Sequence, residues 1–206
     1  MRTNVYVDAF SLYYGCLRDT PYRWLDLQAL SRALLPRDEI HRIRYFTALV
    51  SARPGDPQQA QRQQVYLRAL GTIPNLSIHL GHYLSHPVRM PLVTPHGGQR
   101  TVEVMKTEEK GSDVNLATYL LLDAFQRDCD AAVVITNDSD LKEPIAVAQT
   151  VLGLRVGVIN PHPASHRSRA LKPTFFKQLR PAALRASQFP PVLRDAVGEI
   201  RKPARW

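Results

Sequence analysis

The chain has 206 residues, of which 44% are hydrophobic, and its formal net charge is +9. This length and apolar content suffice for one α/β domain with a hydrophobic core, and no apolar run approaches the ~20 residues of a bilayer-spanning helix. The polar start "MRTNVYVDAF" lacks the pattern of a signal peptide, so we expect a cytoplasmic protein without a membrane partner. The positive charge favours a polyanionic partner, although several basic groups lie close to the end of the chain.

Strands and helices are expected to alternate along most of the chain. Short apolar runs predict strands, and apolar residues at helical spacing predict helices. The expected strands are 4–8, 41–50, 76–84, one within 130–140, and 154–161. The expected helices are 25–35, 58–73, 110–125, 142–153 and a short one within 168–179. Residues 52–59 predict a turn, and "TPHGGQ" predicts the turn of a hairpin.

This alternation favours an α/β fold with a central, mostly parallel sheet and helices on both faces. We expect one domain over residues 1–185. The basic, Pro-containing segment 186–206 is expected to be a poorly ordered tail. Cys16 and Cys129 are too few for a disulfide framework and have no CxxC partner, and Cys129 is expected to be a buried thiol.

Four aspartates lie where the expected strands end or a helix begins. Asp8 closes the first strand, Asp138 and Asp140 follow the strand "VVIT", and Asp113 opens the helix after "EEKGS". Binding sites of parallel sheets gather at the carboxyl ends of the strands, so these segments can meet in one acidic cleft. Mg²⁺ and Mn²⁺ prefer carboxylate oxygen and water, and such ions support phosphoryl chemistry.

Each aspartate also has a structural interpretation. Asp113 is well placed to cap its helix, and Asp138 and Asp140 can cap the following one. Asp8 is the hardest to explain in this way, because a cap requires a helix that starts at once in "AFSLYY". Glu108 and Glu109 are expected to be solvated, although one of them can ligate a metal ion through water. Lys110 can hold a phosphate or offset these two.

Several ordered motifs resemble one known family. The segments "VYVDAFSLYYG", "EEKGSDVNLATYLLLDAF", "VVITNDSDLKEP" and "GVINP" are similar, in this order, to the NYN domain family of PIN-like nucleases, including its LabA-like group. The resemblance covers about residues 3–180. It implies a three-layer α/β/α PIN-like fold and metal-dependent cleavage of RNA.

The resemblance places the family's acidic positions on Asp8, Asp113, Asp138 and Asp140, as catalytic residues and as ligands of Mg²⁺ or Mn²⁺. We expect Ser11, Lys110, Asn137 and Ser139 to contact the substrate. The chain departs from the family pattern at Ser11, where Asn is usual, at Ala9, where Gly is usual, and at Thr136, where Ser is common. All four acidic positions are retained.

Other residues provide weaker signals. His79 and His82 are expected on opposite faces of a strand, which argues against a zinc site. Tyr13 and Tyr14 can stack on a base. Basic residues that can carry RNA phosphates are Arg53, Arg62, Arg68, Lys106, Lys110, Arg167 and Arg169.

The leading hypothesis is a Mg²⁺- or Mn²⁺-dependent ribonuclease acting on single-stranded or structured RNA, with a homodimer as a possible assembly. The alternative is a non-catalytic, RNA-binding regulatory module with the same fold. A metal-dependent phosphatase of small substrates accounts for the aspartates but not for the charge of +9.

Overall fold

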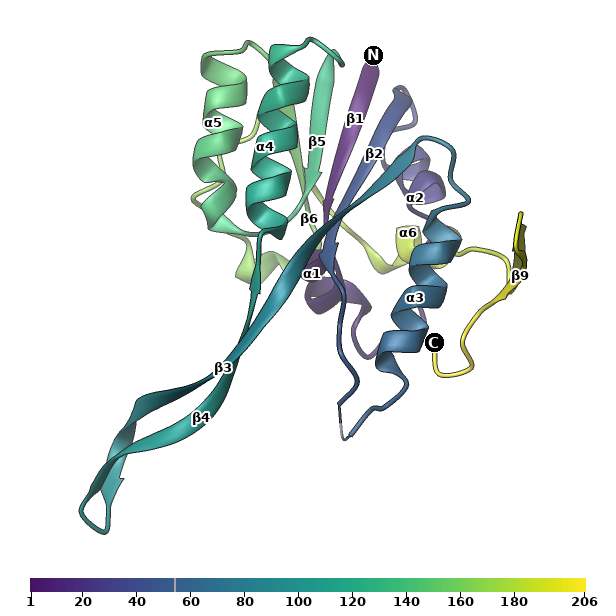
Figure 1. The fold of residues 1–206 in the computed structure, drawn as a ribbon. Coiled ribbons are helices and arrows are strands. Elements are labelled where there is room, and N and C mark those ends of the chain that lie inside the picture. The colour runs from purple at the N-terminus through teal and green to yellow at the C-terminus, as the bar shows by residue number, and fades with distance from the viewer. Residues whose placement is uncertain (54) are drawn as a thin grey trace.

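The fold is known from a computed structural model, which describes residues 1–53 and 55–206. Helices and strands alternate as expected (Figure 1). The strands are β1 (Arg2–Asp8), β2 (Glu39–Ala48), β3 (Leu76–His96), β4 (Gln99–Lys110), β5 (Ala131–Ile135), β6 (Arg155–Asn160), β7 (Phe175–Gln178), β8 (Val192–Asp195) and β9 (Gly198–Arg201). The α-helices are α1 (Ala9–Leu12), α2 (Leu27–Leu34), α3 (Gln59–Leu70), α4 (Ser112–Phe125), α5 (Lys142–Thr150) and α6 (Pro181–Ala186).

A seven-stranded sheet in the order β4-β3-β2-β1-β5-β6-β7 forms the centre of the fold. All neighbouring strands are parallel except the antiparallel pair β3 and β4. The chain proceeds from β1 to β2 and β3 in one direction and later returns to place β5 on the other side of β1. The strand order therefore reverses between β1 and β5, and such a switch point is where open parallel sheets bind their ligands.

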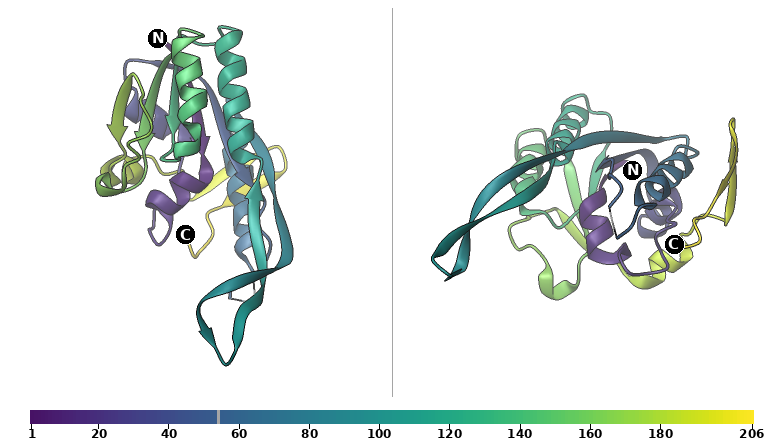
Figure 2. Two further views of the ribbon diagram at one scale, coloured as in Figure 1. Left: turned by 90° about the vertical axis from the view of Figure 1, so that its left-hand side faces the viewer. Right: turned by 60° about the horizontal axis from the view of Figure 1, so that its bottom comes forward.

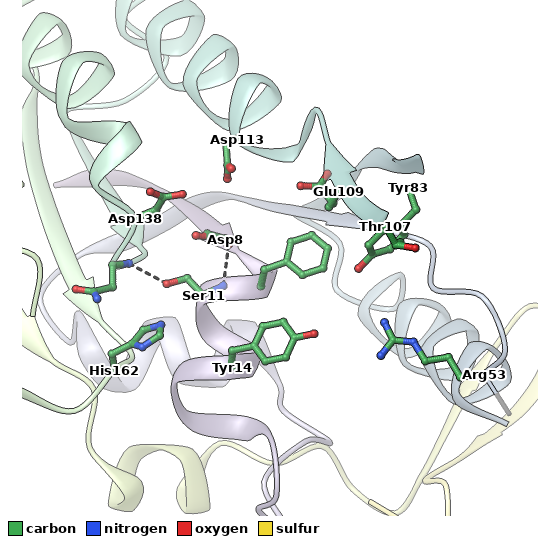
Figure 3. A pocket seen from close by; sticks show the side chains of 12 residues that line it. Asp8, Ser11, Tyr14, Arg53, Tyr83, Thr107, Glu109, Asp113, Asp138 and His162 are labelled. Carbon is green, nitrogen blue, oxygen red and sulfur yellow. Dashed lines mark hydrogen bonds between the residues drawn. The ribbon is translucent and has the colours of Figure 1, made fainter. Parts of the chain in front are cut away.

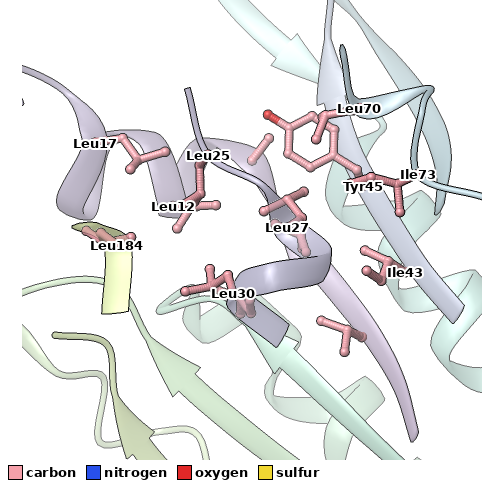
Figure 4. Close-up of a cluster of buried hydrophobic side chains, with 14 of the residues drawn as sticks. Leu12, Leu17, Leu25, Leu27, Leu30, Ile43, Tyr45, Leu70, Ile73 and Leu184 are labelled. Atoms are coloured by element: carbon pink, nitrogen blue, oxygen red, sulfur yellow. The ribbon is translucent and has the colours of Figure 1, made fainter. Parts of the chain in front are cut away.

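Alternation along β1 explains why helices pack on both faces of the sheet. Val5 and Val7 belong to a core that includes residues of α2, α3 and α6, whereas Tyr6 belongs to a second core with residues of α4 and α5. Figure 1 shows α4 and α5 on one side of the sheet and α2, α3 and α6 on the other. Figure 4 shows the first core, where Leu27 and Leu30 of α2 lie beside the sheet.

The hairpin of β3 and β4 is longer than the expected strand 76–84. Its tip is the predicted "HGGQ" turn, in which Gly97 and Gly98 have φ of 56° and 81°. Because each strand pairs with the other, the ribbon continues past the edge of the sheet and projects from the body (Figure 2).

Two expectations near the end of the chain are wrong. The short helix expected within 168–179 is instead strand β7, in which Phe175 and Phe176 favour an extended backbone beside β6. The segment 186–206 is not a poorly ordered tail. It contains the β8–β9 hairpin and buries Phe189 and Ile200 in the first core, and the Trp24 indole donates a hydrogen bond of 2.9 Å to the Pro190 carbonyl.

Two smaller expectations are confirmed, the buried thiol of Cys129 and the turn within 52–59. Cys16 and Cys129 are free, and Cys129 is buried. The turn expected at 52–59 places Arg53 and Asp56 in mutual backbone hydrogen bonds, while Pro54 lies outside the described residues. Over residues 1–53 and 55–206, no helix is both long and apolar enough to cross a lipid bilayer.

Candidate functional site: an acidic hollow at the carboxyl ends of β1 and β5

A hollow of about 580 Å³ lies where β1 and β5 end, at the switch point of the sheet (Figure 3). Its wall combines carboxylates with aromatic and polar side chains from both halves of the sheet. The lining residues are Asp8, Phe10, Ser11, Tyr14, Arg53, Tyr83, Thr107, Glu109, Asp113, Asn137, Asp138 and His162. We call this the acidic hollow.

Asp8 is almost fully buried at the base of the acidic hollow, with 5% of its surface exposed. Helix α1 begins directly after it, and the Asp8 carboxylate caps that helix by accepting a hydrogen bond of 2.9 Å from the Ser11 amide. The other carboxylate oxygen accepts a bond of 2.8 Å from the Thr136 hydroxyl. A helix therefore does start at once in "AFSLYY", so Asp8 has the capping role that was hardest to support from the sequence. Burial, partly offset by these bonds from neutral donors, raises the pKa of Asp8.

Two hydroxyl groups tie β1 to the segment after β5. Thr136, which is fully buried, donates to Asp8 and accepts a bond of 3.0 Å from the Asp138 amide. The Ser11 hydroxyl accepts a bond of 2.8 Å from the Asn137 amide nitrogen of the main chain. Two of the three departures from the family pattern, Ser11 and Thr136, thus supply hydroxyl groups that hold the two strand ends together.

Asn137 uses both ends of its side chain to hold a neighbouring loop. Its Nδ2 donates a hydrogen bond of 2.9 Å to the His166 carbonyl, and its Oδ1 accepts one of 2.8 Å from the Ser168 amide. The side chain lines the acidic hollow, but these bonds give it a structural role beside the expected contact with substrate.

Asp113 lies in the first turn of α4 but does not cap it, contrary to the structural interpretation. The helix begins at Ser112, after Gly111, which has no capping side chain. The Glu109 carboxylate holds this first turn by accepting bonds of 3.1 Å from the Ser112 amide and 2.7 Å from the Ser112 hydroxyl. Gly111 permits this turn, because its φ of 98° is disfavoured for residues with a side chain. The expectation that Glu109 is solvated is wrong.

The carboxyl group of Asp113 instead faces other carboxylates. Burial raises the pKa of Asp113 to about 7, and the neighbouring charges of Asp8, Asp138, Glu109 and Asp140 add to the rise. Three segments distant in the chain therefore bring their acidic groups close enough to oppose each other's ionisation.

Asp138 lines the acidic hollow and also caps a short 3₁₀ turn, Ser139–Leu141, by accepting a bond of 2.9 Å from the Asp140 amide. Ser139 and Asp140 are exposed and lie outside the lining of the hollow, although Asp140 is near enough to act on Asp113. Lys110 is exposed as well and lies 3.5 Å from Glu108, so it offsets its acidic neighbour.

The carboxylate groups around the hollow are chemically suited to bind a hard cation. The acidic side chains that meet there offer oxygen atoms, the ligands that Mg²⁺ and Mn²⁺ prefer. In residues 1–53 and 55–206, no three side chains of His, Cys, Asp or Glu lie close enough together to form a metal-binding group. Burial is the main cause of the raised pKa of Asp113, and mutual repulsion among the carboxylates adds to it; a cation would relieve this repulsion.

Four lining residues were not predicted from the sequence as parts of the site: Phe10, Tyr83, Thr107 and His162. His162 follows the carboxyl end of β6, so the strand-end argument applied to every strand could have found it. Tyr83 and Thr107 come from the β3–β4 ribbon, which pairs with β2 and not with β1, and only the tertiary structure brings these two residues to the hollow.

Known proteins resemble the chain in sequence and in fold. A family model, the NYN domain, matches residues 2–179. The 6-hydroxy-3-succinoylpyridine 3-monooxygenase HspA of Pseudomonas putida (strain DSM 28022 / S16) is 32% identical over 238 aligned positions, which cover 100% of this chain and 75% of that protein. A crystal structure of a Vibrio parahaemolyticus protein of unknown function is 17% identical, has a TM-score of 0.56, and is similar over 91% of this chain and 96% of that one. That structural likeness concerns the fold alone.

Proposed function

The chain belongs to the NYN domain family, and from this premise we propose that it is a metal-dependent ribonuclease with a three-layer PIN-like fold. The family consists generally of nucleases. The observation that supports the finer proposal is the convergence of Asp8, Asp113 and Asp138 in one hollow, where the pKa of Asp113 is raised to about 7. The chain's net charge of +9 suits a partner as acidic as RNA.

The charge balance of the acidic hollow supports a requirement for a cation. Among the described residues, the ion pairs involve other carboxylates, and none includes Asp8, Asp113, Asp138 or Asp140. A phosphate group that enters such a hollow meets like charge, so its binding needs a positive ion between the two. We therefore assign these four aspartates to Mg²⁺ or Mn²⁺.

The chain's own residues would position the ligands and the substrate. A bound divalent ion supplies a water of lowered pKa and stabilises charge on the phosphoryl oxygens. Asp8 is held by the Ser11 amide and the Thr136 hydroxyl, so its carboxylate keeps one orientation. Thr136 also holds the main chain of Asp138, and Asn137 anchors the loop beside it.

The four residues expected to contact the substrate lie in different positions relative to the acidic hollow. Ser11 lines the acidic hollow, so we assign it to the proposed reacting phosphate. Asn137 acts chiefly by holding the loop at His166–Ser168. Lys110 and Ser139 lie outside the hollow, so we assign them only to parts of the RNA away from the cleaved bond.

The test is a cleavage assay on labelled single-stranded and hairpin RNA, with Mg²⁺, with Mn²⁺ and with chelator. We expect wild-type protein to cut RNA only with a metal, and Asp8→Asn to lose at least about 100-fold in rate. Glu199→Gln, in the exposed β8–β9 hairpin, is the control and should cut normally. Circular dichroism shows whether each variant is folded.

Cleavage at the wild-type rate by folded Asp8→Asn, or cleavage insensitive to chelator, contradicts the proposal. RNA that is bound but never cut supports the alternative of a non-catalytic RNA-binding module.

The relative HspA provides a second candidate function, because its name describes the monooxygenation of a pyridine ring and it shares 32% of its aligned sequence with this chain. Its test is incubation with 6-hydroxy-3-succinoylpyridine, flavin, NADH and oxygen. Substrate-dependent NADH oxidation together with a hydroxylated product supports it, and NADH oxidation that does not depend on the pyridine contradicts it.

A further inference from the structure

A second recess of about 310 Å³ opens beside the acidic hollow, between α1, the β3–β4 ribbon and α3. The two cavities share Phe10, Tyr14, Arg53 and Tyr83 as lining residues. We propose that this tyrosine–arginine recess holds one nucleotide unit of an RNA chain next to the cleaved bond, with its base against Tyr14 and its phosphate at Arg53. This proposal rests on the proposed function, because it names the substrate contacts of the same site.

The charge of the recess is opposite to that of the acidic hollow. Its lining includes four guanidinium groups and one carboxylate, that of Asp56. Arg62 pairs with Asp56, and its largely buried side chain keeps an Nη1 atom without a hydrogen-bond partner among the described residues. Arg23 donates to the carbonyls of Thr20 and Arg205. An excess of positive charge remains, and it is suited to an anionic group such as a phosphate.

Exposed aromatic rings line the same recess. Tyr13 and Tyr14 are 37% and 54% exposed, and their ring centroids lie 5.2 Å apart in an edge-on arrangement. Tyr83 meets Phe10 edge-on at 6.2 Å. Figure 3 shows Tyr14 and Arg53 on opposite sides of the opening, with Tyr83 above Arg53. A tyrosine face that is left open to solvent can stack on any base.

Size and position favour a nucleotide unit within a longer chain. A volume of about 310 Å³ lies at the lower end of the range for small-ligand sites, which suits one base with its sugar. Since Tyr14 and Arg53 border both cavities, a strand with one phosphate at the acidic hollow continues directly into the recess. The sign of the charge changes along this path from the cation-binding carboxylates to the phosphate-binding guanidinium groups.

A free heteroaromatic acid shares this chemistry, because it also combines a planar ring with an anionic group. The substrate named for the relative HspA is such a compound. The many guanidinium groups and the junction with the acidic hollow favour the nucleotide, and the experiment separates the two sources.

The experiment measures binding in chelator, so that cleavage does not enter. Without a cation the acidic hollow repels phosphate, and the binding that remains reports on the recess. The probe is a short single-stranded RNA that carries one 2-aminopurine, read by fluorescence anisotropy and by the fluorescence of that base. We expect Tyr14→Ala to weaken binding about 10-fold and to abolish the fluorescence change, because one stacked base is lost. Tyr14→Phe should bind as the wild type does. Arg53→Ala should weaken binding and reduce the salt slope by about one.

Residues suitable for matched control variants lie away from the recess, at the amino ends of the parallel strands. Phe125→Ala removes an aromatic ring that is 77% exposed at the end of α4, and Arg37→Ala removes an exposed guanidinium in the turn before β2. Both should bind within 2-fold of the wild type. An RNA with an abasic position in place of 2-aminopurine should bind the wild type no better than the complete RNA binds Tyr14→Ala.

The proposal is overturned if Tyr14→Ala and Arg53→Ala bind as the wild type does, or if the abasic RNA binds as tightly as the complete one. It is also overturned if 6-hydroxy-3-succinoylpyridine binds in a way that depends on Tyr14 while the RNA does not, since the recess would then hold a free acid. RNA binding with the expected losses but without cleavage under any metal supports the recess and contradicts only the nuclease function.

Discussion

Helix α4 carries one aspartate near each end, and the two have opposite environments. Asp123, near its last turn, is 1% exposed and forms a bidentate pair with Arg44, at 2.8 and 2.7 Å, and accepts a bond of 2.7 Å from the Tyr6 hydroxyl. Asp113, in its first turn, faces other carboxylates, which help to raise its pKa to about 7. The carboxylate near the last turn of the helix is therefore neutralised by an arginine, whereas the carboxylate in its first turn is repelled by other carboxylates.

The surroundings of the ion pair complete the contrast. The Arg44 guanidinium lies 4.5 Å from the centroid of the Tyr119 ring, and Asn4 links the pair to Asp128, which Arg42 binds at 3.1 Å. At the acidic hollow, Asp8 is nearly as buried as Asp123 but accepts hydrogen bonds from neutral donors. A buried carboxylate with a cation of the protein itself serves the fold, whereas one that lacks it is suited to an external cation.

The largest effect on stability is expected from breaking the ion pair between Asp123 and Arg44. Asp123→Asn leaves the Arg44 guanidinium buried without its counter-charge, which costs about 3–5 kcal/mol of folding free energy. We expect the midpoint of thermal unfolding to fall by roughly 10 °C. Differential scanning calorimetry measures this. The double variant Arg44→Met/Asp123→Leu should be more stable than Asp123→Asn, and an unchanged midpoint for Asp123→Asn contradicts the structural role given to the pair.

A smaller effect is expected from the hydroxyl that orders the acidic hollow. Thr136→Val keeps the shape of a fully buried side chain but removes the bridge between the Asp8 carboxylate and the Asp138 amide. We expect a loss of about 2 kcal/mol in folding free energy, because two buried polar groups lose their partner. Urea unfolding measures it. Thr136→Ser should retain most of the stability, and equal stability of the Val and Ser variants would show that the bridge contributes nothing.

The smallest expected effect on stability is a gain, in contrast to the two losses above. In the unfolded chain Asp113 ionises near its ordinary pKa of 3.8, but in the fold only near 7, so its contribution to stability falls as the pH rises between these values. Asp113→Asn should therefore stabilise the metal-free protein at pH 8 by about 1 kcal/mol, a figure reduced from the full shift because the group is partly exposed. At pH 3 the gain should disappear. Thermal unfolding at both pH values measures it.

Addition of Mn²⁺ at pH 8 should make the wild type more stable than Asp113→Asn, because the wild type binds the ion more tightly. If Asp113→Asn is less stable than the wild type at pH 8 without metal, the carboxylates do not oppose each other as inferred.

Much of the fold followed from local patterns. The "VVIT" run and the helical spacing of 110–125 predicted β5 and α4, because the burial of one face imposes a period that can be recognised in the sequence. Helix α1 has only four residues, too few for such a period, and depends on the Asp8 cap for its start. The β8–β9 hairpin was missed because its stability comes from contacts with α3, such as the pair of Arg68 with Asp195, and not from its own sequence pattern.

The sequence by itself determined that Asp8 and Asp138 follow strands and that Asp113 opens a helix, and parallel topology then predicted that they share one edge of the sheet. Only the tertiary structure decided that the Glu109 carboxylate accepts hydrogen bonds from Ser112 at the start of α4, that Lys110 lies outside the hollow, and that the tyrosine–arginine recess adjoins the hollow. Strand order follows from periodicity and chain direction, which are local properties. The ionisation of a carboxylate depends on charges and burial contributed by distant segments, and these are defined only once the chain has folded.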